Sequence, residues 1–229
     1  VYEQYEWSLD SQRPERSTSS MQLWWFTGSF EMRYTDDYSF SIADGWEKTG
    51  TESFQPYQLS AQLEIPYNPE PMWKNRVTVS SNISSALQLN LLRYTDSVLQ
   101  FSWNTRLEVA EFLDLQFRVS SANNTIYRYI PAFTEELGVT TQDPIEDLLK
   151  SFNFFNRDDR LESKFNLQDI SFSLIHYMHD WQLNMEYTGR PELNEENEYT
   201  WRSEFSIFVQ WNPIPEIRKQ VDYSDNNLQ

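Results

Sequence analysis

Hydrophobic and polar residues alternate along most of this chain with a period of two. In the segment 97–107, Leu99, Phe101 and Trp103 are separated by polar neighbours, and the segment 199–211 repeats the pattern. Successive side chains of a β-strand point to opposite faces, so this period indicates strands with one apolar face. Helical spacing does not fit so many segments of this kind.

The pattern predicts an all-β protein, an antiparallel meander of about 12 strands. Segments such as 97–107 and 199–211 are longer than a typical soluble strand of about five or six residues. They approach the roughly 9–11 residues that a tilted transmembrane strand needs. We therefore predict a transmembrane β-barrel, or a part of a larger one. The expected strands are 1–10, 20–34, 38–47, 52–66, 72–83, 85–94, 97–108, 110–121, 124–133, 164–177, 181–189 and 199–211.

The expected connections alternate in length, as they do in outer-membrane barrels with short periplasmic turns and longer external loops. A periplasmic end for 199–211 would place the long loops outside, although 66–72 is long for a periplasmic turn. The short connections are 34–38, 94–97, 121–124 and 178–180, and the long ones are 11–19, 134–163 and 190–198.

One short loop helix is expected at 143–149. Asp143 is a suitable N-cap, Pro144 occupies the first helical position, and acidic residues follow in the first turn. After Trp211, Pro213 and Pro215 break the strand pattern. We therefore divide the chain into a barrel segment at 1–211 and a polar tail or short extra strand at 212–229. Because the sequence opens directly in strand-like residues, we expect a fragment of a longer protein or a trimmed mature segment.

Composition narrows the function classes. A net charge of −17 and an isoelectric point near 4.4 argue against nucleic-acid binding, which needs clustered basic residues. The aromatic fraction of 16% suits strands and membrane interfaces. The chain has no cysteine, which excludes disulfides and cysteine zinc sites. Its apolar runs are all shorter than the roughly 18 residues that a transmembrane helix needs.

The sequence contains no recognisable catalytic motif, and we predict no enzyme, metal or cofactor. His176, His179 and Asp180 are the one cluster of possible metal ligands, but residues three apart on a strand face opposite sides, so an interfacial turn is the preferred interpretation. Five arginines are candidates either to contact an anionic cargo or to pair with acidic residues on the polar strand faces. We select three of them as lumen contacts, namely Arg106, Arg118 and Arg202. The other two candidates are Arg76 and Arg128.

Two segments carry a resemblance to a known family. Ser171–Trp181 (SFSLIHYMHDW) and Ser203–Glu216 (SEFSIFVQWNPIPE) resemble the C-terminal end of the outer-membrane lipopolysaccharide-assembly protein LptD, also called OstA or Imp, in its divergent spirochaete-like forms. The similarity covers the C-terminal part of the chain, from Ser171 onward. The preceding region agrees only in its barrel-like pattern.

The resemblance implies a transporter in the bacterial outer membrane that delivers lipopolysaccharide, or a related glycolipid, to the outer leaflet through a lateral seam in a large barrel. It also implies an LptE-like lipoprotein plug, periplasmic Lpt bridge proteins, the barrel-assembly machinery and membrane lipid as partners. In this interpretation 199–211 is the last strand, so it forms one side of the seam. The seam and assembly signal is then Phe205, Ile207, Val209 and Trp211, with Pro213 and Pro215 ending the strand.

The sequence departs from the family pattern in two respects, since it has neither the periplasmic jellyroll domain nor the cysteines that link jellyroll and barrel in proteobacterial members. Two alternatives stay open. The first is a self-contained outer-membrane porin or solute channel, in which 1–10 would pair with 199–211. The second is a soluble carbohydrate-binding β-sandwich, which would have shorter strands and one aromatic core.

Overall fold

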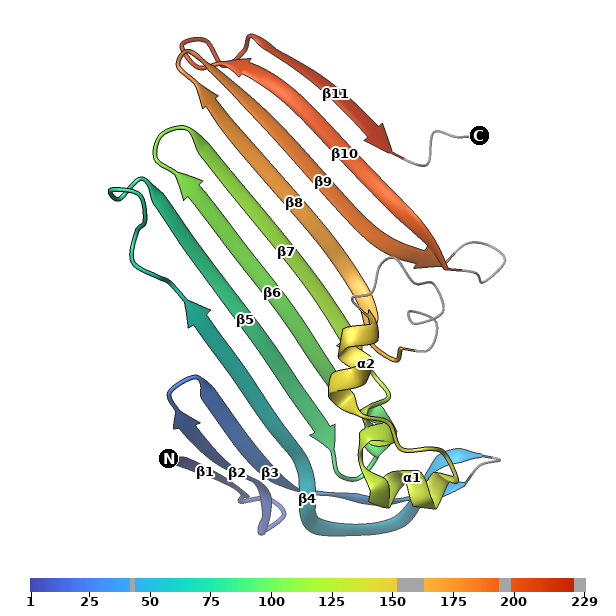
Figure 1. The fold of residues 1–229 in the computed structure, drawn as a ribbon. Coiled ribbons are helices and arrows are strands. Elements are labelled where there is room, and N and C mark those ends of the chain that lie inside the picture. Colours follow the sequence, from blue (N-terminus) through green and yellow to red (C-terminus); the bar gives the residue numbers. More distant parts are fainter. Residues whose placement is uncertain (42–43, 152–162, 194–198, 225–229) are drawn as a thin grey trace. The chain divides into compact units, whose positions relative to one another are not determined.

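The computed structural model describes residues 1–41, 44–151, 163–193 and 199–224, which form an all-β protein (Figure 1). The strands pair antiparallel in chain order within one 11-stranded sheet. The strands are β1 (Tyr2–Ser8), β2 (Arg13–Leu23), β3 (Phe26–Ser41), β4 (Gly45–Tyr67), β5 (Val77–Asn90), β6 (Val98–Val109), β7 (Leu113–Asn123), β8 (Asn166–Met178), β9 (Trp181–Leu193), β10 (Tyr199–Trp211) and β11 (Arg218–Ser224). The helices are η1 (Tyr94–Asp96), η2 (Ile126–Tyr129), α1 (Pro131–Leu137) and α2 (Pro144–Ser151).

The chain divides into two compact units. The first unit comprises Val1–Glu64, Ser85–Gln100 and Ala122–Asn166, and the second comprises Ile65–Ser84, Phe101–Ser121 and Leu167–Gln229. Within the described residues β1 and β11 each have a single strand neighbour, so the described sheet is open. No helix in these ranges is both long and apolar enough to cross a membrane.

The prediction of an all-β protein with antiparallel strands in chain order is confirmed, but several predicted boundaries are wrong. The expected turn at 34–38 lies inside β3, because cross-strand hydrogen bonds satisfy its aspartates: Thr51 and Ser53 donate to Asp37 at 2.8 and 3.0 Å. The expected break between 83 and 85 lies inside β5, where the hydroxyls of Ser84 and Ser102 are 2.7 Å apart.

At the N-terminal end, the predicted loop 11–19 mostly belongs to β2, and the predicted strand 20–34 is divided by a turn at Trp24 and Trp25. Trp24 adopts a left-handed backbone conformation with φ of 49°. The β-propensity of tryptophan does not indicate such a conformation. The segment after Trp211 forms β11, so the short-strand alternative for the C-terminal segment is the correct one.

The predicted strand 124–133 is also wrong, since this segment forms η2 and the start of α1. The Asn123 side chain accepts hydrogen bonds from the Thr125 amide at 2.6 Å and the Thr125 hydroxyl at 2.9 Å, which turns the chain out of β7. The predicted loop helix is confirmed as α2, whose cap Asp143 accepts from the Ile145 and Glu146 amides. The sequence analysis missed α1.

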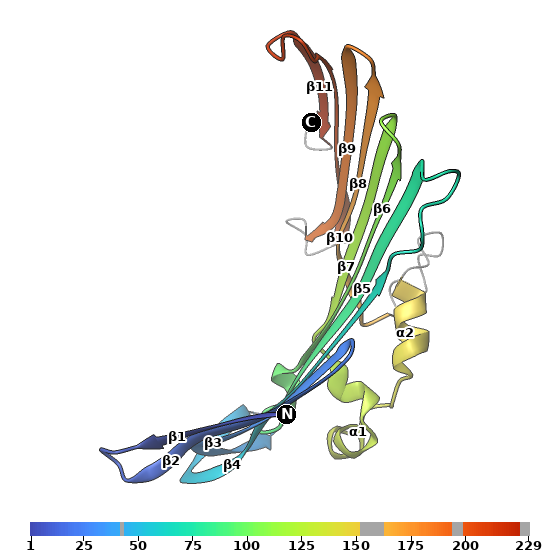
Figure 2. The same ribbon diagram turned by 90° about the vertical axis from the view of Figure 1, so that its left-hand side faces the viewer.

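An aromatic cluster forms the core of the first unit. Tyr94 is only 5% exposed; its ring stacks on Phe133 with centroids 4.5 Å apart and meets the edge of Trp46 at 5.0 Å. Phe40 packs against Trp46 from β3. The helices α1 and α2 follow one another in the chain and are drawn outside the sheet (Figure 2).

A polar network fixes α2 to the end of β7. The Tyr129 hydroxyl donates to the buried carboxylate of Asp147 and accepts from the Asn123 amide group. The Lys164 amide also donates to Asp147, at 2.9 Å, and the Ser163 hydroxyl donates to the Asp147 carbonyl. Burial, followed by the nearby Asp147 carboxylate, raises the pKa of Tyr129. The phenol therefore stays protonated as a donor well into alkaline solution.

Replacing Tyr129 by Phe should loosen this connection, because Asp147 loses a donor while it stays buried. We expect a loss of about 1–3 kcal/mol in the local opening free energy, measured by hydrogen exchange of the α2 amides. Tyr127→Phe is the matched control on η2, and its hydroxyl has no hydrogen bond within the described residues. Equal exchange in both variants would contradict the network. Because the pKa of Tyr129 is raised in the folded chain, the stabilisation from its hydrogen bond to Asp147 is fully present below about pH 10. It is lost as the pH rises further.

Candidate functional site

The sheet of the second unit has one continuous apolar face. Registers between β8, β9, β10 and β11 align its side chains in rows across the strands. Within the described part of this unit, Val119 is the one apolar side chain that is buried, and large side chains such as Trp103, Trp181 and Val221 are exposed. A long apolar sheet face is therefore available to something outside the described residues.

Aromatic and aliphatic rows follow one another on this face. One aromatic row contains Phe172, Tyr187, Phe205 and Tyr223. An aliphatic row contains Leu174, Met185, Ile207 and Val221, and the following row contains Leu183 and Val209 with His176 and Lys219 at its two ends. Trp181 and Trp211 end the face beside the turns, stacked at 6.2 Å. One aliphatic row and one mixed row thus lie between aromatic side chains on this face.

A tryptophan over a glycine marks the other end of this face. The indole of Trp201 donates to the Tyr187 hydroxyl at 3.1 Å and covers Gly189 on the neighbouring strand. A Cβ atom at position 189 would lie 2.5 Å from the Trp201 ring and 2.7 Å from the Tyr187 hydroxyl. Glycine is therefore required here for close approach of the ring, and the sequence analysis missed this pair.

The opposite face of the second-unit sheet is mostly polar, although Ile175 and Phe208 also lie on it. Its neutral side chains form short ladders, for example Ser84 with Ser102, and Gln116, which donates to Asn104 at 3.4 Å. Ser120 donates to Asp169 on β8. Such a face suits water or a polar ligand and is poorly suited to a dry core.

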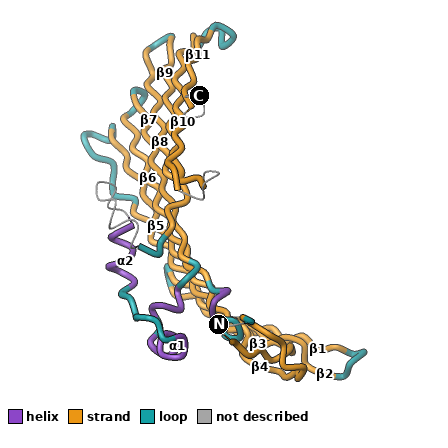
Figure 3. The backbone as a smooth tube through the Cα atoms, turned by 90° about the vertical axis from the view of Figure 1, so that its right-hand side faces the viewer, coloured by secondary structure: helices purple, strands orange, loops and turns teal. Residues whose placement is uncertain are grey.

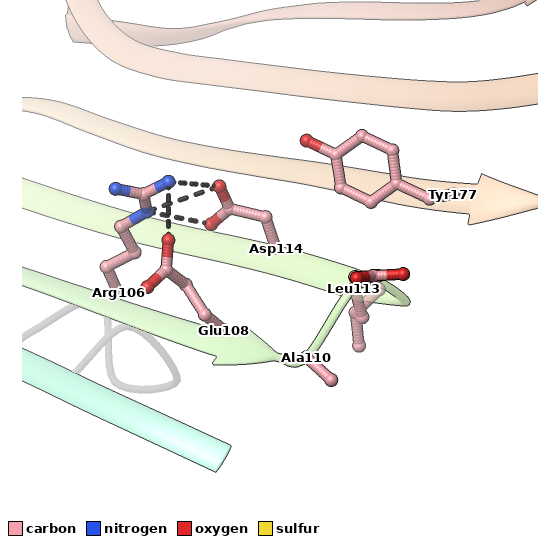
Figure 4. Close-up of a pocket in the computed structure, with 7 residues that line it drawn as sticks. Arg106, Glu108, Ala110, Leu113, Asp114 and Tyr177 are labelled. Carbon is pink, nitrogen blue, oxygen red and sulfur yellow. Dashed lines mark hydrogen bonds and ion pairs between the residues drawn. The ribbon is translucent and has the colours of Figure 1, made fainter. Parts of the chain in front are cut away.

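A small depression of about 300 Å³ lies on this face near the β6–β7 turn (Figure 4). Arg106 is its central residue and makes hydrogen bonds of 2.6–3.2 Å to the Asp114 carboxylate and an ion pair of 2.8 Å to Glu108. Tyr177 lines the same depression from β8. Because two carboxylates already engage Arg106, its charge is compensated within the protein.

The other two predicted lumen contacts differ from each other. Arg202 lies on the polar face of β10 with its Nε 3.2 Å from a Glu204 oxygen, so it is paired on its own strand. Arg118 is exposed on the polar side of β7, and it has no ion pair within the described ranges. The structure therefore does not gather Arg106, Arg118 and Arg202 into one site, and of the three Arg118 keeps its charge available.

The remaining candidates are dispersed. The Arg76 side chain is exposed in the β4–β5 turn, and Arg128 is half-buried in η2 of the first unit. His176 packs edge-on against Phe112 at 4.4 Å with Nδ1 3.0 Å from the Phe112 carbonyl, while His179 occupies the turn with φ of 52°. The described residues hold no group of three or more metal-ligating side chains.

The predicted last strand is not at the sheet edge, and this expectation is corrected. β11 pairs with β10 from Glu204 to Gln210, which includes Phe205, Ile207 and Val209. Pro213 and Pro215 lie in the turn that reverses the chain between these strands, so they end β10 without ending the sheet. Along 199–203, β10 has no partner residues in β11 as far as the strand is described.

The first unit contains a buried ion cluster that the sequence analysis did not select. Glu31 is 8% exposed; it lies 2.7 Å from both the Arg16 and the Arg33 guanidinium groups. Arg33 also lies over the Tyr57 ring at 4.1 Å. The registers of β2, β3 and β4 bring these residues to one face. The β2–β3 register pairs Arg16 with Arg33 without a bulge, whereas Tyr57 lies at the bulge between β3 and β4; alternation alone does not predict either pairing.

Comparisons of the chain with known protein families, with curated proteins and with solved structures return no match. The functional argument therefore rests on the two faces of the second unit and on the residues that line them.

Replacing Gly189 by Ala should displace the Trp201 ring and break its hydrogen bond to Tyr187. We expect a destabilisation of about 1–3 kcal/mol, measured by denaturant unfolding in lipid or detergent. Gly28→Ala is a graded comparison, because its Cβ would meet the flexible Phe26 ring at 3.0 Å and should cost less. A Gly189→Ala variant as stable as Gly28→Ala would contradict the close packing of Trp201.

Proposed function

We propose that this chain is a segment of a bacterial outer-membrane β-barrel that helps deliver lipopolysaccharide or a related glycolipid to the outer leaflet. The observation that carries the membrane part is the apolar face of the second unit, with one aliphatic and one mixed row between aromatic side chains. The delivery part rests on the resemblance of 171–181 and 203–216 to LptD. No covalent chemistry is needed for this activity.

The strand dimensions agree with a bilayer. β8, β9 and β10 have 13 residues each. Trp201 and Trp211 are ten residue steps apart on the apolar face of β10. At about 3.3 Å per residue and a tilt of about 40°, this separation spans roughly 25 Å along the membrane normal, close to the apolar band of an outer-membrane barrel.

The topology weighs against a soluble carbohydrate-binding sandwich. A sandwich buries the apolar face of one sheet against a second sheet. Here all described strands belong to one sheet, and the apolar face of the second unit has no covering sheet among them. Lipid acyl chains are the simplest cover for a face of this length.

Strand parity favours part of a larger barrel over a self-contained porin. Among the described strands of this antiparallel meander, β1 and β11 run in the same direction, so pairing them with each other would need one parallel pair. Bacterial single-chain barrels have an even number of antiparallel strands. The pairing of 1–10 with 199–211 that a porin would need is hindered as well, because β11 occupies that edge of β10.

The proposed roles follow the geometry. The polar face would line a hydrated lumen, in which Arg118 is the available contact for anionic groups of the cargo. The lateral opening is proposed at the free edge of β11, a strand of 7 residues whose short ladder is weaker than its neighbours. Phe205, Ile207, Val209 and Trp211 remain the proposed signal for the barrel-assembly machinery, with an LptE-like plug and periplasmic bridge proteins as proposed partners.

Adjacent residues of β10 provide a matched test of the membrane face. Ile207→Lys places a charge on the apolar face and should cost about 2–4 kcal/mol if that face meets the bilayer midplane. Ser206→Lys places the same charge on the polar face and should have little effect. Folding into lipid vesicles, followed by heat modifiability on gels, measures the difference. Equal folding of both variants would refute a lipid-facing apolar side.

The delivery step needs a cellular test. Depletion of the protein should reduce glycolipid labelling at the cell surface while total glycolipid synthesis continues. Complementation with Arg118→Gln should restore less surface labelling than complementation with Arg202→Gln, since Arg202 is already paired with Glu204. Normal surface labelling after depletion would overturn glycolipid delivery and leave the porin alternative.

A further inference from the structure

The turn between β4 and β5 is unusually ordered for an irregular connection. Residues 68–76 form the irregular connection between β4 and β5, one of the loops drawn in Figure 3, and a bridge joins Met72 to Val77 across its tip. The Met72 amide donates to the Val77 carbonyl at 2.8 Å, and the Val77 amide donates back at 3.1 Å. The Arg76 carbonyl accepts from the Ala110 amide at 2.6 Å, which fixes the turn to the neighbouring hairpin.

The tip has a backbone conformation that L-residues rarely adopt. Trp73, Lys74 and Asn75 have φ of 51°, 57° and 61° in succession, and none of the three is a glycine that would relieve the strain. The conformation leaves Trp73 68% exposed beside an exposed Met72. A strained turn that holds a tryptophan in solvent is a candidate contact surface.

The charge of the tip is opposite to that of the chain. Lys74 and Arg76 are exposed and have no ion pair in the described part of the structure, whereas the whole chain has a net charge of −17. An exposed tryptophan flanked by unpaired basic side chains matches a bilayer surface with anionic headgroups: the indole enters the interface and the cations meet phosphates.

Other connections at the same edge of the second unit share part of this character. Antiparallel pairing in chain order places the β4–β5, β6–β7 and β10–β11 turns at one edge. Phe112 is exposed in the second of these turns, and Ile214 and Ile217 are exposed in the third. Lys219 lies on the apolar face close to the turn, where its ammonium can reach the headgroups.

We propose that the Met72–Arg76 tip is a docking element for anionic phospholipid headgroups. The element fixes the turn edge of the second unit at the membrane–water boundary. This assignment rests on the proposed barrel. It also predicts how the sheet is oriented in the membrane: the edge with the β4–β5 turn lies at a phospholipid leaflet, and the edge with the long connections lies at the opposite membrane surface.

The absence of cysteine allows a clean test with the full chain. Single variants Met72→Cys, Ile207→Cys and Gln220→Cys would each carry a nitroxide, in vesicles of phosphatidylcholine alone or of equimolar phosphatidylcholine and phosphatidylglycerol. Accessibility to oxygen and to a water-soluble nickel complex reports the depth of each label. Position 207 tests the lipid-facing strand, position 220 is the polar-face control, and position 72 tests the tip.

We expect the label at 72 to lie at headgroup depth and more deeply with phosphatidylglycerol. Lys74→Gln with Arg76→Gln should lower the partitioning of the tip into anionic vesicles by about fivefold per charge, with little change on phosphatidylcholine. Water exposure at 72 with lipid exposure at 207 would overturn the docking element and leave the barrel standing. Lipid exposure at 72 with water exposure at 207 would keep the element and remove the barrel. Equal depth on both vesicle types would overturn the requirement for anionic headgroups.

Discussion

The two-residue period of the β-strand is the constraint on which the rest of this protein depends. Every described strand pairs with its neighbour in the chain, so a residue's parity along the strand decides which face it occupies. Phe205 and Ile207 join one face, and Ser206 joins the other. At a bulge, such as the one between Glu31 and Met32, an irregularity in one strand shifts the pairing register. The sheet of the second unit therefore has one mainly apolar side and one mainly polar side.

The two sides make different demands on their surroundings. Aromatic and aliphatic rows cover the apolar side of the second unit, and no second sheet is present in the described ranges to bury them. The polar side instead satisfies its groups locally, through Ser84 with Ser102 and through Arg106 with Asp114. Arg106 and Arg202 are paired with acids on this side, and Arg118 differs from them because no acid of the described strands reaches it.

The capping residues Asp143 and Pro144 predicted the loop helix, and alternation along the sequence was sufficient to predict the all-β class and the antiparallel order of the long C-terminal strands. It was insufficient wherever a long-range partner decides the conformation. Asp37 suggested a turn, but hydroxyls of β4 hold it in a strand. Gly189 is explained only by the Trp201 ring on the next strand, and α1 depends on Tyr94, which is distant in sequence. The intrinsic secondary-structure preference of a residue does not predict such long-range pairings.

The connection between β7 and β8 has a property that the sheet lacks. Several of its described side chains, among them Ile126, Thr134 and Asp147, are almost fully buried, although Ile145 and Leu149 are exposed, whereas few strand residues of the second unit are buried. Under the proposed membrane assignment, the chain combines a connection that has its own small set of buried side chains with a sheet whose apolar side faces lipid. Removal of lipid would then expose the apolar side of the sheet and leave the buried contacts of the connection in place.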